Sequence, residues 1–236
     1  MYVITADQRD SRTDRDRAGD LMRALNSNFR AAFVLPPDQT AGDEIQVMIE
    51  DAATTLDAIL LVHRTDHWSI GLGLGAVRTP LPASTRTAAG SAFIAARDAV
   101  TRAKRTDTRF ALAAISPEAE PSGLEARTRE PHDGVTHDRE AADLEASALD
   151  AADLESLIGM LLLLRQRRSP EGWQAIDLVQ TGLSQADAAS RLGISTAAIS
   201  QRLKTASWRA EQAAGPALVK LLTDLHRRTT ETDPAA

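Results

Sequence analysis

The feature that most constrains the fold is a short segment in the C-terminal third, in which two serines suited to start helices flank a glycine. Residues 182–195 read Gly-Leu-Ser-Gln-Ala-Asp-Ala-Ala-Ser-Arg-Leu-Gly-Ile-Ser. Ser184 suits an N-cap, because its hydroxyl can accept a hydrogen bond from a first-turn N–H, and Asp187 can reciprocate. Gly193 suits the left-handed conformation that ends a helix, and Ser195 can cap the next helix. The segment therefore predicts two short helices joined by a tight turn.

The second helix of this pair is predicted to have one apolar and one polar side. Its apolar side contains Ala198, Ile199, Leu203 and Ala206. Short polar and amide side chains at the start of such a helix can contact base edges and phosphates in a DNA major groove. The candidate DNA-binding residues are Ser195, Thr196, Ala197, Ser200, Gln201, Arg202 and Lys204.

Basic residues gather in the same third of the chain, although the protein as a whole is acidic. The formal net charge is −6 at pH 7. Residues 165–228 hold ten Lys and Arg against five Asp and Glu, which gives this region +5 and leaves −11 for the rest. This asymmetry indicates nucleic-acid contact, while a helical domain with solvated basic faces explains it equally well. The predicted phosphate-neutralising residues are Arg165, Arg167, Arg168, Arg202, Lys204 and Arg209.

Residues 182–206 resemble the helix-turn-helix that sigma-factor region 4 shares with LuxR-type regulators. The common pattern is Gly-Leu-Ser, a small residue inside the first helix, Leu-Gly-Ile-Ser, and then a polar helix. The resemblance implies a DNA-binding module whose second helix enters the major groove. The alternative is a helical hairpin used for packing or dimerisation, and sigma-like modules also occur in proteins that bind other proteins.

Composition divides the 236 residues into four parts. Residues 1–116 predict an α+β domain, and residues 117–150, rich in Pro, Ala, Asp and Glu, predict an acidic linker or arm whose end, at 143–150, could be helical. Residues 151–228 predict an all-α domain that carries the helix pair, followed by a disordered tail at 229–236. Within the all-α part, the apolar side of Leu157–Leu164 predicts either a dimer surface or core packing.

The N-terminal part is predicted to alternate strands and helices in the order βαββαβαβ. Strands are expected at 2–6, 32–35, 45–49, 68–73 and 110–115, and helices at 18–29, 51–62 and 90–105. This order describes an antiparallel sheet with helices packed on one side, in a ferredoxin-like or palm-like arrangement. The fold class predicted for the whole chain is α+β.

Short motifs in this part resemble the SatD family of bacterial proteins. They are Asp-x-x-x-Ser-Arg at 7–12, Gly-Asp-Glu-x-Gln at 42–46 and Gly-x-Ala-Phe-x-x-Ala-Arg at 90–97. A looser resemblance links the same part to the palm-like domain of class III nucleotidyl cyclases and diguanylate cyclases. It rests on Ile-Gly-Leu-Gly-Leu-Gly at 70–75 and Ala-Ala-Arg at 95–97. The cyclase resemblance implies a domain that handles nucleotides.

Asp7 and Asp43 are the metal ligands that the cyclase resemblance implies. Two carboxylates that converge on Mg²⁺ can hold a triphosphate, so Mg²⁺ with a nucleotide is the implied cofactor. The chain departs from the cyclase pattern at Phe93, where an Asn is expected, and it has no clear base-selecting residue. A palm that binds a nucleotide or only scaffolds therefore fits better than an active cyclase. Without a metal, Asp43 is a turn residue and Asp7 caps a helix or pairs with Arg9 or Arg12.

Other classes of protein are excluded or disfavoured by composition. The chain has no cysteine, which excludes disulfides and thiolate metal sites. No apolar run approaches the ~20 residues of a membrane span, and the first residues lack the basic and apolar pattern of a signal peptide. The sequence therefore predicts a cytoplasmic protein that has no membrane partner.

Three functions remain open from the sequence. The leading prediction is a sequence-specific DNA-binding transcriptional regulator, whose N-terminal domain senses a ligand or mediates assembly. The alternative is a metal-dependent enzyme that binds or processes a nucleotide and is targeted by the helix-turn-helix. An assembly protein that uses both modules for protein contacts is the third. The expected partners are DNA, a second copy of the chain and a nucleotide ligand.

Overall fold

The computed structural model describes residues 1–40, 42–115 and 134–230, with side chains described from residue 149 in the last range. These residues form two compact units. The first, which we call the sheet unit, comprises Met1–Ser156 and Val219–Ala236, and the second, the helical unit, comprises Leu157–Leu218. Half of the expected linker, residues 117–133, and the last six residues of the expected tail lie outside the described residues.

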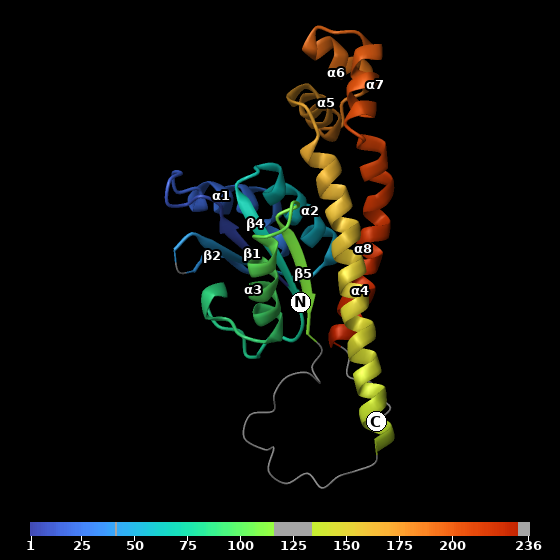
Figure 1. Ribbon diagram of the computed structural model, residues 1–236. Coiled ribbons are helices and arrows are strands. Elements are labelled where there is room, and N and C mark those ends of the chain that lie inside the picture. Colours follow the sequence, from blue (N-terminus) through green and yellow to red (C-terminus); the bar gives the residue numbers. More distant parts are fainter. Residues whose placement is uncertain (41, 116–133, 231–236) are drawn as a thin grey trace. The chain divides into compact units, whose positions relative to one another are not determined.

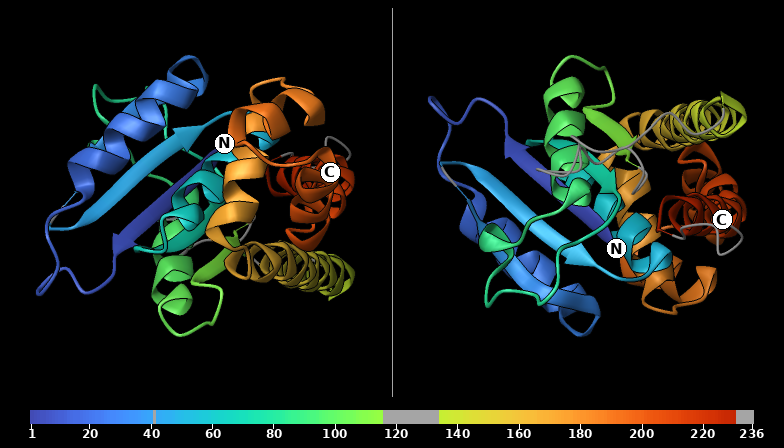
Figure 2. Two further views of the ribbon diagram at one scale, coloured as in Figure 1. Left: turned by 90° about the horizontal axis from the view of Figure 1, so that it is seen from above. Right: turned by 90° about the horizontal axis from the view of Figure 1, so that it is seen from below.

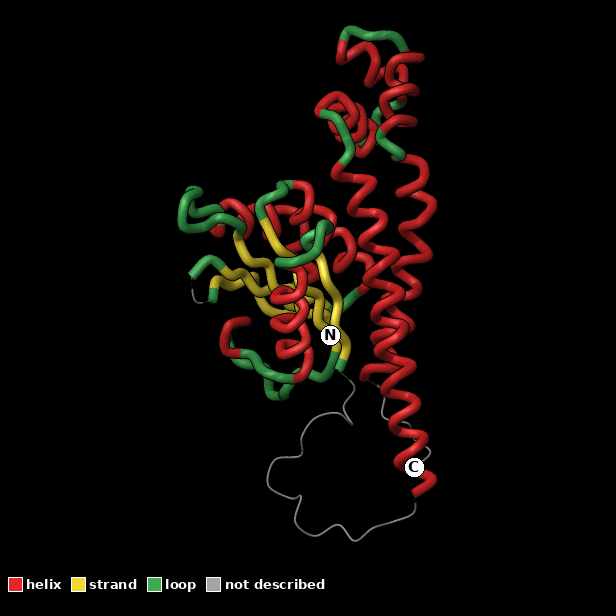
Figure 3. The backbone as a smooth tube through the Cα atoms, viewed as in Figure 1, coloured by secondary structure: helices red, strands yellow, loops and turns green. Residues whose placement is uncertain are grey.

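The sheet unit contains both strands and helices, whereas the regular elements of the helical unit, whose residues are all described, are helices (Figure 1, Figure 3). The first elements in chain order are β1 (Tyr2–Gln8), α1 (Ala18–Phe29), the 3-10 helix η1 (Arg30–Ala32), β2 (Phe33–Gln39), β3 (Glu44–Ile49), α2 (Ala52–Arg64), β4 (Trp68–Leu74), the 3-10 helix η2 (Thr85–Thr87), α3 (Ser91–Ala103) and β5 (Phe110–Ala114). The remaining helices are α4 (Gly134–Gln166), α5 (Pro170–Gln180), α6 (Gln185–Leu192), α7 (Thr196–Thr205) and α8 (Trp208–Thr230). The α+β class and the order βαββαβαβ are confirmed. Helix α4 begins inside the range that composition assigns to a linker, and α8 extends to within six residues of the C-terminus.

The sheet has the strand order β2-β3-β1-β4-β5 and is mixed. The pairs β2–β3, β1–β3 and β1–β4 are antiparallel, whereas β4 and β5 are parallel. The prediction of a wholly antiparallel sheet is therefore wrong at one pair. Helix α3 carries the chain back along the sheet before β5 begins, and such a crossover makes the next strand run parallel to the previous one.

Helices cover both faces of the sheet, so the prediction of helices on one side is also wrong. Every residue of β4 is buried, and alternate residues of a strand point to opposite faces. One face is covered by α3, which lies on the near side of the sheet in Figure 1, with α1 and α2 behind it (Figure 1, Figure 2). Gly71 and Gly73 of β4 lie so close to the backbone of α3 that a Cβ at either position would overlap it. These glycines let a helix and a strand approach more closely than larger residues allow.

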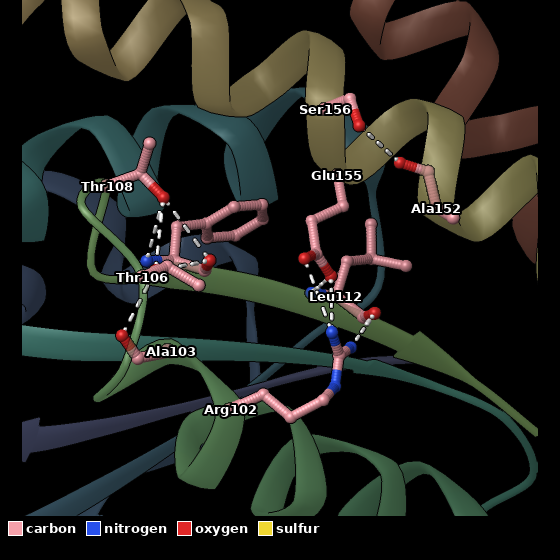
Figure 4. A network of polar contacts seen from close by, with 9 residues as sticks. Arg102, Ala103, Thr106, Thr108, Leu112, Ala152, Glu155 and Ser156 are labelled. Carbon is pink, nitrogen blue, oxygen red and sulfur yellow. Dashed lines mark hydrogen bonds and ion pairs between the residues drawn. The ribbon is translucent and has the colours of Figure 1, made fainter.

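The outer edge of β5 is closed by a polar network from α4 and α3 (Figure 4). The backbone N–H of Leu112 donates a hydrogen bond to Glu155 Oε2 at 2.7 Å. Arg102 donates to the same carboxylate oxygen at 3.0 Å and to the Leu112 carbonyl at 2.6 Å. An edge strand otherwise leaves such groups open to pairing with another chain. The network thus satisfies both backbone groups of Leu112 without a further strand.

The end of α8 packs against the first residues of the chain in the sheet unit. The Tyr2 hydroxyl donates to the Leu222 carbonyl at 3.1 Å, and the Tyr2 and His226 rings lie 4.6 Å apart. The Met1 amine lies 2.8 Å from His226 Nε2. Burial lowers the pKa of His226 to about 4, helped by the nearby amino-terminal charge, and burial lowers the pKa of the Met1 amine to about 6. The His226 imidazole and the Met1 amine are therefore both mostly neutral at pH 7 in the folded protein.

We expect this contact to weaken in acid. An unfolded histidine takes up its proton near pH 6.5, whereas folded His226 resists protonation until about pH 4, so stability is lost as the pH falls through this window. Urea titrations at several pH values should show that His226→Phe is less sensitive to pH between 6.5 and 4 than the unchanged protein. Asn26→Ala, an exposed and uncharged position in α1, should keep the original pH dependence. Parallel curves for the protein and His226→Phe would contradict the assignment.

Candidate nucleic-acid interface

The two serine caps and the left-handed glycine predicted for residues 184–198 are present, while Asp187 reciprocates through the Ser184 hydroxyl and not through the backbone N–H of a capping box. Ser184 Oγ accepts a hydrogen bond from the Asp187 N–H at 3.1 Å and donates to Asp187 Oδ2 at 2.6 Å. Gly193 has a φ of +66°, in the left-handed region that ends a helix. Ser195 Oγ accepts from the Ala198 N–H at 3.2 Å. Helices α6 and α7 therefore begin and end where local chemistry favours it.

A small apolar core holds α5, α6 and α7 together in the helical unit. Its buried residues are Ala175, Ile176, Ala188, Ala189, Ile199, Leu203 and Ala206. Four of the seven are alanines, so the helix backbones pack closely. Ile199 and Leu203 confirm the predicted inner face of α7, and Ala198 at its edge is half-buried. The opposite side of α7 is consequently turned away from this core.

The outward side of α7 presents most of the predicted DNA-binding residues. Those that are exposed are Ser195, Thr196, Ala197, Ser200, Gln201 and Lys204. Arg202 is half-buried and adds to the positive field at Glu171, whose carboxyl pKa is lowered mainly by a hydrogen bond from Ser169. The exposed side thus combines hydroxyl, amide and ammonium groups, which can bind base edges and phosphates.

An open groove of about 750 Å³ runs along one flank of this face. Its apolar lining includes Val179, Leu183, Leu203 and Trp208. Its polar lining includes Ser200, Lys204 and Arg209. Because the lining residues come from α5, α7, α8 and the start of α6, no single sequence pattern predicts the groove.

Two of the arginines predicted to neutralise phosphates have a different role. The Arg165 and Arg168 side chains are 7% and 0% exposed, and both pair with the buried carboxylate of Glu211. The two guanidinium groups lie 4.9 and 4.8 Å from the centre of the Trp173 ring. Arg168 also donates to the carbonyl of Ala206, at the end of α7, at 2.8 Å. These arginines are internal supports of α7, so the prediction that they contact phosphate is wrong.

The apolar run in α4 is divided between two environments. Ile158 and Leu162 are fully buried, which fits core packing. Leu157, Met160 and Leu164 are exposed at positions that share one side of the helix, and Met160 is 64% exposed. The dimer surface expected on this helix stays a prediction.

The two predicted metal ligands lie on neighbouring backbone segments, but the partner of Asp7 is a lysine. The Gln8 N–H donates to the Asp43 carbonyl at 3.3 Å, so the end of β1 and the β2–β3 turn meet as expected. The Asp7 carboxylate accepts a hydrogen bond from Lys104 Nζ at 2.8 Å, in place of the expected Arg9 or Arg12. Within the described ranges, no three His, Asp or Glu side chains gather as a metal site. Metal binding by Asp7 and Asp43 stays a prediction.

Among the described residues, no helix is both long enough and apolar enough to span a bilayer.

Comparison of the chain with family models, curated proteins and solved structures gives no match. The resemblances to SatD proteins, cyclases and sigma-type modules therefore stay predictions.

Proposed function

We propose that the protein is a sequence-specific DNA-binding transcriptional regulator in which α6 and α7 form a helix-turn-helix. Helix α7 is the recognition helix, and its exposed side lies in the major groove. The observation that carries the proposal is the division of α7 into a buried side with Ile199 and Leu203 and an exposed polar side with Ser200, Gln201 and Lys204.

The chemistry of the exposed side supports this assignment. Gln201 can form paired hydrogen bonds with adenine, and Lys204 can neutralise a phosphate. Ser195 uses its oxygen lone pair as a cap, which leaves its O–H free to donate to a phosphate. The buried Arg–Glu–Arg group and the Ser184 and Ser195 caps hold α7 rigidly, and rigid placement is what base recognition needs.

The sheet unit is assigned the sensing or assembly role in this proposal. The four strands β2-β3-β1-β4, connected through α1 and α2, support a ferredoxin-like arrangement to which α3 and β5 are added. Such a sheet positions loops at its edges, and ligand sites in proteins commonly lie on loops held by a rigid scaffold.

The proposal is tested by selecting bound sequences from a random duplex library and then measuring affinities by gel shift. The double variant Gln201→Ala, Lys204→Ala should bind the selected duplex about 10- to 100-fold more weakly, since a lost base contact costs ~1–3 kcal/mol. Loss of the lysine contact should also lower the dependence of affinity on salt concentration by about one unit of slope.

The matched control removes the same two residue types from α8. Gln212 and Lys220 are both exposed, so Gln212→Ala, Lys220→Ala has the same charge change without touching α7. It should bind DNA as the unchanged protein does. If no sequence is enriched, or if both double variants lose affinity equally, α7 is not the reading helix.

A further inference from the structure

The sheet unit contains a second site, a basic pocket that brings together the ends of two of the short sequence motifs, at Gln46 and Arg97, with two arginines that belong to neither motif, Arg78 and Arg86. The pocket has a volume of about 320 Å³ and lies between β3, the loop that connects β4 to α3, and the first two turns of α3. Its residues with polar side chains are Gln46, Arg78, Arg86 and Arg97. Phe93 and Ile94 form part of its apolar wall. A pocket of this size is in the range that small ligands occupy.

The loop between β4 and α3, which carries Arg78 and Arg86, is held in place by buried contacts. The hydroxyl of Thr85, which is fully buried, donates to the Pro36 carbonyl at 2.6 Å. Ser91 Oγ accepts from the Ala76 N–H at 2.9 Å. Gly90 has a φ of +141° and lies so close to Ala76 that a side chain would not fit. Arg78 and Arg86 are therefore carried by a loop anchored on both sides, which lowers the entropy cost of binding.

The charge in the pocket is only partly balanced by the protein. The Arg86 guanidinium lies 3.6 Å from the Asp38 carboxylate. In the part of the chain that the structure describes, no carboxylate pairs with Arg78 or Arg97, and the three arginines against Asp38 and Glu44, the latter bonded to the pocket residue Gln46, leave a net charge of +1. The N-terminus of α3 adds a partial positive charge on the same side. This balance suits an anion.

A buried polar side chain forms part of the pocket wall. Gln46 is 3% exposed and lines the pocket. Its Nε2 donates to Glu44 Oε1 at 3.3 Å. On the neighbouring position of β1, Thr5 Oγ1 is buried without a partner. The amide of Gln46 is therefore a polar group beside the arginines that can exchange a hydrogen bond with a ligand.

We propose that this pocket binds a small organic phosphate, whose dianionic group lies between Arg78 and Arg97 and whose organic part packs against Phe93 and Ile94. Arginine binds phosphate through paired hydrogen bonds, which distinguishes phosphate from a singly charged ligand. The assignment requires neither a metal nor Asp7 or Asp43, and it does not depend on DNA binding by α7.

The test is isothermal titration of the full chain with inorganic phosphate, phenyl phosphate and succinate, all in the presence of EDTA. Phenyl phosphate should bind more tightly than inorganic phosphate, because its ring adds apolar contact, and succinate should bind at least tenfold more weakly than either. Arg97→Gln and Arg78→Gln should each weaken phosphate binding about tenfold or more, as expected for the loss of a charge-assisted hydrogen bond. Arg105→Gln, an exposed arginine at the end of α3 and outside the pocket, should bind as before.

Other results would overturn the proposal. No binding of either phosphate at millimolar concentration would exclude the site, as would equal binding of succinate or retained binding in an Arg78→Gln, Arg97→Gln double variant. Binding of a single-stranded oligonucleotide that requires Arg97, without binding of small phosphates, would make the pocket part of a nucleic-acid surface. The double variant should still shift the DNA selected for α7, which separates failure of this site from failure of the DNA-binding proposal.

Discussion

Replacing Gly73 by alanine is expected to unfold or grossly loosen the sheet unit. A Cβ at this position would overlap the Ala92 carbonyl oxygen and the Ala96 amide nitrogen, which both belong to the backbone of α3. Backbone atoms cannot rotate away as a side chain can, so α3 would have to move off the sheet. Overpacking of a core usually costs ~1–3 kcal/mol, and a clash between two backbones belongs at or above the top of that range. Urea titration followed by circular dichroism should show the loss.

The matched control is Gly19→Ala in α1 of the same unit. A Cβ there would lie 3.5 Å from Arg23 Nη1, an ordinary contact, and alanine favours a helix over glycine by about 1 kcal/mol. The control should therefore be neutral or stabilising. Because Phe93 and Arg97 lie on the helix that Gly73→Ala displaces, this variant should also lose phosphate binding. Unchanged stability of Gly73→Ala would show that α3 does not approach β4 this closely.

The second large effect is expected for Glu211→Gln, which should unfold the helical unit. This substitution keeps the shape of the side chain but leaves the guanidinium groups of Arg165 and Arg168 buried without a counter-charge. Removing one partner from a buried ion pair typically costs ~3–5 kcal/mol, a large share of the ~5–15 kcal/mol that holds a domain together. The loss should appear as a lower urea midpoint and as loss of DNA binding, because Arg168 also holds the end of α7.

Two further variants separate the effect of leaving buried charges unpaired from the effect of removing an acidic side chain anywhere in the unit. Glu171→Gln removes an exposed carboxylate in the same unit and should cost much less stability than Glu211→Gln, because it weakens only the hydrogen bond from Ser169 and leaves no buried charge unpaired. The triple change Arg165→Met, Arg168→Met, Glu211→Leu removes all three charges together and should recover much of the loss, since apolar replacement of a complete buried group is often tolerated. A triple variant less stable than Glu211→Gln would contradict this explanation.

Interactions that depend on nearby residues were predictable from the sequence. The caps of α6 and α7 join a serine to a group three residues later, and the left-handed Gly193 needs only its own backbone. The order of helices and strands in the sheet unit followed from apolar periodicity in the same way, whereas the end of β2 did not, since β2 continues through Pro36 and Pro37 to Gln39. In each case the stabilising partner lies within one turn or one strand, so a single stretch of sequence contains the information.

Features that depend on distant partners were not predictable. Arg165 and Arg168 look like any basic pair, because their partner Glu211 lies 46 and 43 residues further along the chain. The phosphate pocket joins Gln46 and Arg97, which lie in two separate short motifs, to the loop residues Arg78 and Arg86, which lie in none, and the folded sheet unit brings them together. The parallel pairing of β5 likewise depends on where α3 returns the chain, and the antiparallel alternative satisfies the same apolar pattern.

The sheet unit is built from two stretches of chain, with the helical unit inserted between them. This order matters during synthesis, since the ribosome releases residues 157–218 before the stretch that begins at Val219. The helical unit can therefore assemble its own core while Tyr2 still lacks the backbone carbonyl of Leu222. Strand β1 therefore gains its contact with α8 only after the whole helical unit has been synthesised.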